Sequence, residues 1–235
     1  MAFSAVIFDV DGTLVDTNEL HALAWQRAFE QEVGQRPELS RILLNIGMGG
    51  DRLVPAVVGE ALEQSHGDAL RDAESRHFER LLELAPKRVF PEVERLLEEL
   101  CRRGLPVALA TSSQEANFER LLDAFGLDLP RRVSTVITAD DVASSKPAPD
   151  LICKAVSALA VEPARCLMIG DTPYDGEAAR AAGVAFVGVR SGGWSDEALR
   201  AAGARLTVAD TGELVRSLDR VLALEAPDLG TQRSP

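Results

Sequence analysis

Short apolar runs recur along the chain, and each is followed by a loop and then by a segment whose apolar positions have helical spacing. The runs are "AVIFD" (5–9), "LPVALATSS" (105–113), "RVSTVITA" (132–139), "RCLMIGD" (165–171) and "VAFVGVR" (184–190). Runs this continuously apolar are typical of strands that are buried on both faces, as in a parallel sheet covered by helices. The pattern therefore predicts an α/β fold with a doubly wound parallel sheet.

One interval breaks this alternation. Between about Asn18 and Leu84 there is no strand candidate, only helical patterns such as "NELHALAWQRAFEQEV" and "LRDAESRHFERLLEL". The flanks "VDTN" and "LAPKRVFP" are polar or contain Pro, as expected where a chain leaves one domain and re-enters it. We predict a core formed by residues 1–16 and 85–235 and a helical cap formed by residues 17–84. The last ten residues, "APDLGTQRSP", are expected to form a frayed tail.

The composition narrows the class of partner. The chain has 235 residues, of which 46% are hydrophobic, and a formal net charge of −12. It has no Lys/Arg cluster, so we expect neither nucleic acid nor a membrane as a partner, because anionic phosphates are bound by positive surfaces. No apolar run approaches the roughly 18 residues that a membrane span needs. We expect a cytoplasmic protein that is a monomer, with a homodimer as the alternative.

Polar residues gather just after the predicted strands. In an open parallel sheet, ligands bind beyond the carboxyl ends of the strands, so such residues share one crevice. Several carboxylates there suit Mg²⁺, which takes further ligands from water and a substrate phosphate. A Lys ammonium and a hydroxyl can bind phosphoryl oxygens, and phosphoryl transfer mostly requires charge neutralisation and positioning. The residues are Asp9, Asp11, Thr111, Ser112, Lys146, Asp171 and Asp175.

Asp9 and Asp11 are one residue apart at the end of the first predicted strand. If strand geometry continues through "FDVD", both side chains face the substrate. One carboxylate can attack phosphorus to form an aspartyl-phosphate, and the other can protonate the leaving alcohol and then deprotonate the attacking water. Gly12 permits a tight turn beside them.

Each of these residues also has a simpler interpretation. An Asp after a strand is often only a turn residue or a helix cap. Thr111 and Ser112 can cap a helix that begins near Gln114, and Lys146 can be a solvated surface charge. The joint occurrence of all of them in this order is far less expected by chance.

The stretches "DVDGT", "TSS", "SKPAPD" and "GDTPYDGEAARAAG", in this order and spacing, resemble the four motifs of the haloacid dehalogenase superfamily. The resemblance implies a Rossmann-like core with an inserted all-helical cap of the C1 type. It implies that Asp9 is the nucleophile, Asp11 the general acid/base, and Thr111 and Lys146 phosphate binders. The Mg²⁺ ligands that it implies are the Asp9 side chain, the Asp11 backbone carbonyl and Asp171, with Asp175 close to the metal or its waters. Because dehalogenases typically lack an Asp at the position of Asp11, phosphoryl transfer is favoured.

Within the superfamily, "DTNELHALAW" and "NIGMGGDRL" resemble the phosphoglycolate phosphatase and β-phosphoglucomutase group. His21 takes the place of a hinge His that in the mutases helps relay protons to the acid/base Asp; otherwise it is a polar residue near a helix start. The mutases hold a distal phosphate with an Arg in the cap loop, but Arg52 is displaced by two positions here. Gly49 and Gly50 give the loop the flexibility to reach the crevice.

The sequence thus predicts a Mg²⁺-dependent phosphatase that hydrolyses a small phosphate monoester, of the phosphoglycolate or sugar phosphate type, through phospho-Asp9. A phosphosugar mutase of the β-phosphoglucomutase type is the alternative, and a non-catalytic binding protein is a third reading that no residue supports. Besides the catalytic residues, those predicted to bind substrate or phosphate are Gly12, His21, Gly49, Gly50, Arg52 and Ser112.

Overall fold

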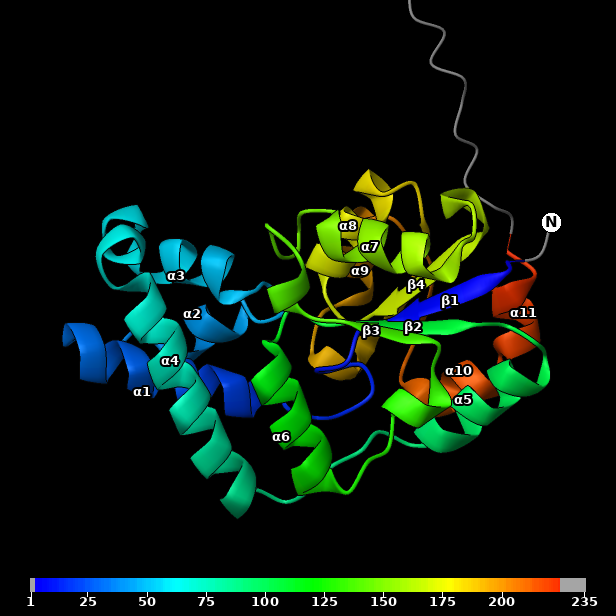
Figure 1. Ribbon diagram of the computed structural model, residues 1–235. Coiled ribbons are helices and arrows are strands. Elements are labelled where there is room, and N and C mark those ends of the chain that lie inside the picture. The colour runs from blue at the N-terminus through cyan, green and yellow to red at the C-terminus, as the bar shows by residue number, and fades with distance from the viewer. Residues whose placement is uncertain (1–2, 225–235) are drawn as a thin grey trace, which may run out of the picture.

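A parallel sheet forms the centre of the protein (Figure 1). The computed structural model describes residues 3–224, so the predicted tail lies outside the described residues. Within this range, six strands pair in parallel in the order β3-β2-β1-β4-β5-β6. They are β1 (Ala5–Phe8), β2 (Val107–Ala110), β3 (Thr135–Ile137), β4 (Cys166–Gly170), β5 (Ala185–Val189) and β6 (Ala204–Val208). Five of them lie in the predicted runs, and β6 was not predicted.

Helices cover both faces of the sheet, as Figure 1 shows. Alternate residues of β1 face opposite sides: Val6 and Phe8 belong to one hydrophobic cluster, and Ala5 and Ile7 belong to another. The first cluster is completed by α5 (Val93–Arg102), α6 (Glu115–Phe125), α10 (Thr211–Arg216) and α11 (Leu218–Leu222). The second is completed by α7 (Asp150–Leu159), α8 (Pro173–Ala181) and α9 (Asp196–Ala201). The predicted doubly wound α/β fold is therefore confirmed.

The segment between β1 and α5 is helical and lies beside the sheet (Figure 1). It contains α1 (Asn18–Val33), α2 (Leu39–Leu43), α3 (Gly50–Val58) and α4 (Glu60–Leu84). These helices bury a cluster of their own, which includes Trp25, Phe29, Ile42, Leu53 and Leu70. A separate core is what a cap needs in order to hold its shape; the domain boundaries at 16/17 and 84/85 stay predictions.

The strand register determines which side chains meet. Phe8 of β1 is paired with Leu109 of β2 and with Ile169 of β4, so the residues after these three positions lie side by side at one edge of the sheet. Short 3₁₀ helices complete the connections at Pro130–Arg132, Ala139–Asp141, Pro163–Arg165 and Arg190–Gly192. In the described range, no helix combines the length and the apolar character that a membrane span requires.

Candidate active site

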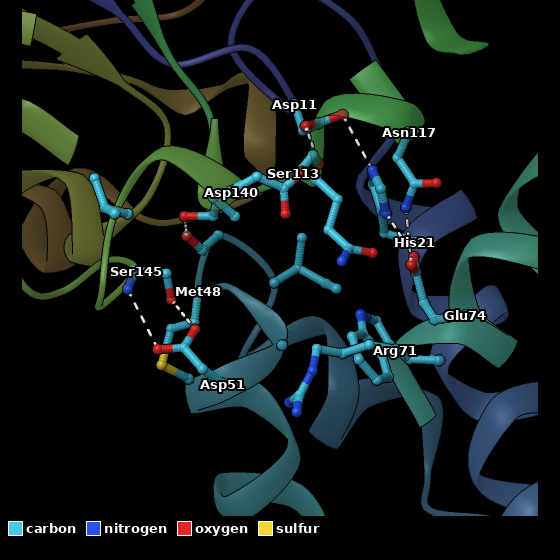
Figure 2. A pocket seen from close by; sticks show the side chains of 18 of the residues that line it. Asp11, His21, Met48, Asp51, Arg71, Glu74, Ser113, Asn117, Asp140 and Ser145 are labelled. Atoms are coloured by element: carbon cyan, nitrogen blue, oxygen red, sulfur yellow. Dashed lines mark hydrogen bonds and ion pairs between the residues drawn. The ribbon is translucent and has the colours of Figure 1, made fainter. Parts of the chain in front are cut away.

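A cavity of about 250 Å³ opens at the carboxyl ends of β1 and β2 and is closed on the other side by α1, α3 and α4 (Figure 2). Its walls therefore come from both the sheet and the helical segment. Residues that line it from the sheet side include Asp9, Asp11, Ser112 and Ser113; those from the helical side include His21, Trp25, Gly50, Asp51, Arg71 and Glu74.

The chain turns sharply where β1 ends. The prediction that strand geometry continues through "FDVD" was wrong, because β1 stops at Phe8. Gly12 has a φ of +78° and donates its amide hydrogen to the carbonyl of Val15 over 2.7 Å. A positive φ is unfavourable for side chains with a Cβ, so Gly is needed here. Asp9 and Asp11 nevertheless line the same cavity, through this turn rather than through strand alternation.

Lys146 is fully buried and does not line the cavity, although its neighbour Ser145 does. Its Nζ lies 2.5 Å from Asp9 Oδ1 and 2.8 Å from Asp175 Oδ1. Burial alone would lower the pKa of Lys146, but the contacts with Asp175 and Asp9 raise it above its ordinary value, so the ammonium stays charged. The simpler interpretation of Lys146 as a solvated surface charge is therefore wrong.

Asp171 is also fully buried. It accepts hydrogen bonds from Thr13 Oγ1 over 2.9 Å and from Asn18 Nδ2 over 3.0 Å. A Cβ on Gly12 or Gly192 would overlap the Asp171 carboxylate. These glycines thus allow the backbone to approach the acid closely.

Asp9, Asp171 and Asp175 each offer an oxygen within 4.8 Å of the others, and such a buried acidic cluster can hold a metal ion. Burial, together with Asp9 and Asp175, raises the pKa of Asp171 well above its ordinary value. Burial also raises the pKa of Asp9 to about 7, against the opposing effect of Lys146. Three buried carboxylates that repel one another offer hard oxygen donors, and such a set fits a divalent cation. The Asp11 side chain lies outside this cluster, so Asp11 would bind a metal ion only through its backbone carbonyl.

Asp11 is bound from two sides. Its Oδ1 accepts from Thr17 Oγ1 over 2.6 Å and lies 3.2 Å from His21 Nε2. Its Oδ2 accepts from Ser113 Oγ over 3.0 Å and from Thr111 Oγ1 over 3.3 Å. Burial alone would raise the pKa of Asp11, but His21 and the hydroxyls of Thr17 and Ser113 lower it to about 2. The Thr111 hydroxyl is thus directed at the second carboxylate of the site.

His21 is more than a polar residue near a helix start. It is buried between Asp11 and Glu74, whose Oε1 lies 2.9 Å from His21 Nδ1. Burial alone would lower the pKa of His21, but Asp11 and then Glu74 raise it to about 10. The ring is therefore an imidazolium at neutral pH.

Residues 6–189 match the family of haloacid dehalogenase-like hydrolases. The chain belongs to this family. It is 35% identical over 196 residues to the plasmid-encoded protein CbbY of Cupriavidus necator, covering 78% of this chain and 76% of that protein. It is 32% identical over 190 residues to the fructose-1-phosphate phosphatase YqaB of Escherichia coli, covering 80% and 97%. A crystal structure of a hydrolase from Pseudomonas syringae has a TM-score of 0.86 at 31% identity, covering 94% and 100%. The predicted family and the prediction of a hydrolytic enzyme are confirmed.

The loop that joins α2 and α3 of this hydrolase lies on the sheet domain beside Lys146. The Gly49 amide donates to Ser145 Oγ over 2.9 Å, and Ser112 Oγ donates to the Gly47 carbonyl over 3.0 Å. Gly50 lines the cavity. Ser112 and Gly49 thus hold the loop against the domain that carries the acids.

The arginine that lines the cavity is not the one that the sequence predicted. Arg52 does not line the cavity; its side chain is half exposed and lies 3.5 Å from Asp51. Arg71, which sequence analysis missed, lines the cavity from α4. Its guanidinium donates to Glu63 Oε1 over 2.9 Å and to Asp68 Oδ1 over 2.8 Å.

Glu74 of α4 and Asn117 of α6 also line the cavity and were not predicted from the sequence. Both lie in stretches rich in charged residues, which are typical of solvated helix faces. A signal for Glu74 was present, because it lies four residues after Leu70 and four before Phe78, both buried. A charged residue on an apolar helical stripe indicates a buried polar contact.

Proposed function

We propose that this hydrolase is a Mg²⁺-dependent phosphatase that hydrolyses a small phosphate monoester through an aspartyl-phosphate on Asp9. The observation that supports it most is the arrangement around Asp9. This buried carboxylate contacts the Lys146 ammonium and lines the same cavity as a second carboxylate, Asp11. The fructose-1-phosphate phosphatase among the relatives supports the same class of substrate.

The first step forms the covalent intermediate. An Asp9 oxygen attacks phosphorus, the bond from phosphorus to the ester oxygen breaks, and Asp11 passes a proton to the leaving oxygen. The contact with His21 keeps Asp11 ionised before the reaction, so the His21 imidazolium is the source of this proton. Lys146 donates to Asp9 and forms an ion pair with Asp175, and a further N–H of its ammonium can go to a phosphoryl oxygen.

The second step returns the enzyme to its starting state. Asp11 takes a proton from water and passes it back to His21, the water oxygen attacks phosphorus, and the bond from phosphorus to Asp9 breaks. Asp9, Asp171 and Asp175 would hold Mg²⁺, which supplies positive charge for the phosphoryl oxygens when it is bound. Thr111 helps to hold the Asp11 carboxylate in place through its hydrogen bond to Asp11 Oδ2.

The walls of the cavity favour hydrolysis over phosphosugar mutation. A mutase must hold a sugar bisphosphate, which needs a cation for the distal phosphate. Among the described lining residues the one arginine is Arg71, whose guanidinium is paired with Glu63 and Asp68; Arg52 does not line the cavity. A cavity of about 250 Å³ suits a small leaving group, and this lining favours one without negative charge.

We further propose that residues 17–84 act as a cap that selects the leaving group over a core of residues 1–16 and 85–235. The support is that the cavity has walls from both segments. The reacting carboxylates come from the first segment of the core, whereas Trp25, Gly50 and Arg71 come from the helical segment.

The test is release of inorganic phosphate from a panel of monoesters with Mg²⁺, with and without catalytic glucose 1,6-bisphosphate. We expect free phosphate from a narrow set of esters and no isomerised sugar. Asp9→Asn should lose this activity while keeping the fold. Isomerised sugar with little free phosphate would instead establish a mutase, and near-normal hydrolysis by Asp9→Asn would refute the aspartyl-phosphate.

A further inference from the structure

A chain of hydrogen bonds connects Asp11 to the opposite wall of the cavity (Figure 2). His21 Nε2 lies 3.2 Å from Asp11 Oδ1, and His21 Nδ1 lies 2.9 Å from Glu74 Oε1. Asn117 Nδ2 donates to Glu74 Oε2 over 3.1 Å. His21, Glu74 and Asn117 are 7%, 4% and 3% exposed, so water competes little for these bonds.

The His21 ring is held on three sides. Carboxylates of Asp11 and Glu74 lie at its two nitrogens, and one face stacks on Phe78 with the ring centres 3.8 Å apart. A carboxylate can only accept, so Nδ1 carries a proton toward Glu74 and Nε2 is directed at Asp11. Glu74 and Phe78 are one helical turn apart on α4. One face of this helix therefore sets the orientation of the ring.

Packing alone does not explain a carboxylate at this position of α4. Its neighbours on the buried side of the helix, Leu70, Ala73 and Phe78, are apolar. A carboxylate buried among them is unfavourable unless both of its oxygens have partners. An apolar side chain would fill the space without needing partners, so the contacts with His21 and Asn117 are what Glu74 adds.

We propose that Glu74 is a positioning residue that orients His21 toward Asp11, and that Asn117 makes this orientation depend on the contact between α4 and α6. Asn117 donates to Glu74 and accepts from Ser75 Oγ, so the two helices exchange hydrogen bonds in both directions. The contact that seats the helical segment on the sheet domain therefore also orients His21 toward Asp11. This inference rests on the proposed function, in which Asp11 is the acid/base residue.

The test compares two esters that differ in their need for a proton. An alkyl phosphate needs a proton on its leaving oxygen, whereas p-nitrophenyl phosphate releases a stable phenolate. For each ester we would measure kcat/KM, which reports the steps up to release of the alcohol. Glu74→Ala should lower it by at least about 30-fold for the alkyl ester and by less than about threefold for the aryl ester. Glu74→Gln keeps an oxygen for His21 and should recover at least about tenfold of the alkyl activity.

Asp72→Ala is the matched control. Asp72 lies on the same helix, two residues before Glu74, on the exposed side, so its loss removes a carboxylate from α4 without reaching His21. Its ratio of the two kcat/KM values should match that of the wild type, and this ratio does not depend on the fraction of folded enzyme. Equal losses for both esters in Glu74→Ala, or an intact alkyl activity, would overturn the proposal. If the wild type hydrolyses neither ester with Mg²⁺, the proposed function itself has failed.

Discussion

Replacing Asp171 with Asn should stabilise the metal-free protein, although Asp171 is buried and hydrogen-bonded. The change removes one of three carboxylates that converge within 4.8 Å. Asn has almost the same shape as Asp. It can still accept from Asn18 Nδ2 and can donate to Thr13 Oγ1, so both contacts of Asp171 are kept. The substitution therefore tests charge rather than packing.

The magnitude follows from the distances. Two unit charges about 5 Å apart interact by about 3 kcal/mol at an effective dielectric constant of about 20. Asp171 is repelled by Asp9 and Asp175 and attracted by the Lys146 ammonium, so the net repulsion is about 3 kcal/mol when all are ionised. Protonation of Asp171 relieves part of it, because its pKa is raised well above 3.8. We expect a gain in the free energy of unfolding of about 1–3 kcal/mol at pH 8, or roughly 2–12 °C in Tm.

The gain should depend on pH in a definite direction. Asp171 ionises near pH 3.8 in the unfolded chain and at a higher pH in the folded protein. Its ionisation therefore destabilises the folded state increasingly as the pH rises from 3.8 toward the folded-state pKa. The advantage of Asp171→Asn should be smaller at pH 5 than at pH 8.

The assay is thermal unfolding followed by circular dichroism, in EDTA and in saturating Mg²⁺. Mg²⁺ at about 100 times its Kd should stabilise the wild type by about 2.7 kcal/mol, and Asp171→Asn should lose most of this increment. Asp72→Asn, on the exposed side of α4, removes the same charge. It should change neither the Tm in EDTA nor the stabilisation by Mg²⁺. A lower Tm for Asp171→Asn in EDTA at pH 8 would refute the electrostatic reasoning. An unchanged increment from Mg²⁺ would remove Asp171 from the metal site.

Three further predictions concern single side chains. Asp9→Asn should lower phosphate release by at least about 10³-fold with a near-native circular dichroism spectrum, because Asp175, the other carboxylate beside Lys146, does not line the cavity; activity within tenfold of the wild type would contradict it. Lys146→Met should lower the free energy of unfolding by about 3–5 kcal/mol in urea titrations, because it leaves two buried carboxylates without their cation; an unchanged midpoint would show that the pair adds no stability. His21 has a folded-state pKa of about 10, so its stabilising contribution is full below pH 6.5 and is lost as the pH rises through 10. His21→Asn should therefore flatten the decline of Tm between pH 7 and pH 10, and parallel declines in the two proteins would refute this.

Local patterns of apolar residues were sufficient to predict five of the six described strands. Strands β1, β2, β4 and β5 are buried along their whole length, and that burial is what makes them continuous apolar runs in the sequence. Strand β6 escaped prediction for the opposite reason. It is an edge strand in which Arg205 is exposed between two buried neighbours, so "ARLTV" lacks a continuous run.

The sequence by itself determined the order of strands and helices, the helical insertion and the acids that follow the strands, because each depends on neighbouring residues or on a short motif. Only the tertiary structure decided which long-range partners these residues meet. It buried Lys146 between Asp9 and Asp175, bound Arg71 to Glu63, and turned a charged stretch of α4 inward so that Glu74 reaches His21. The physical reason is that the burial of a charge, and hence its pKa and its role, depends on side chains from distant segments that only folding brings together.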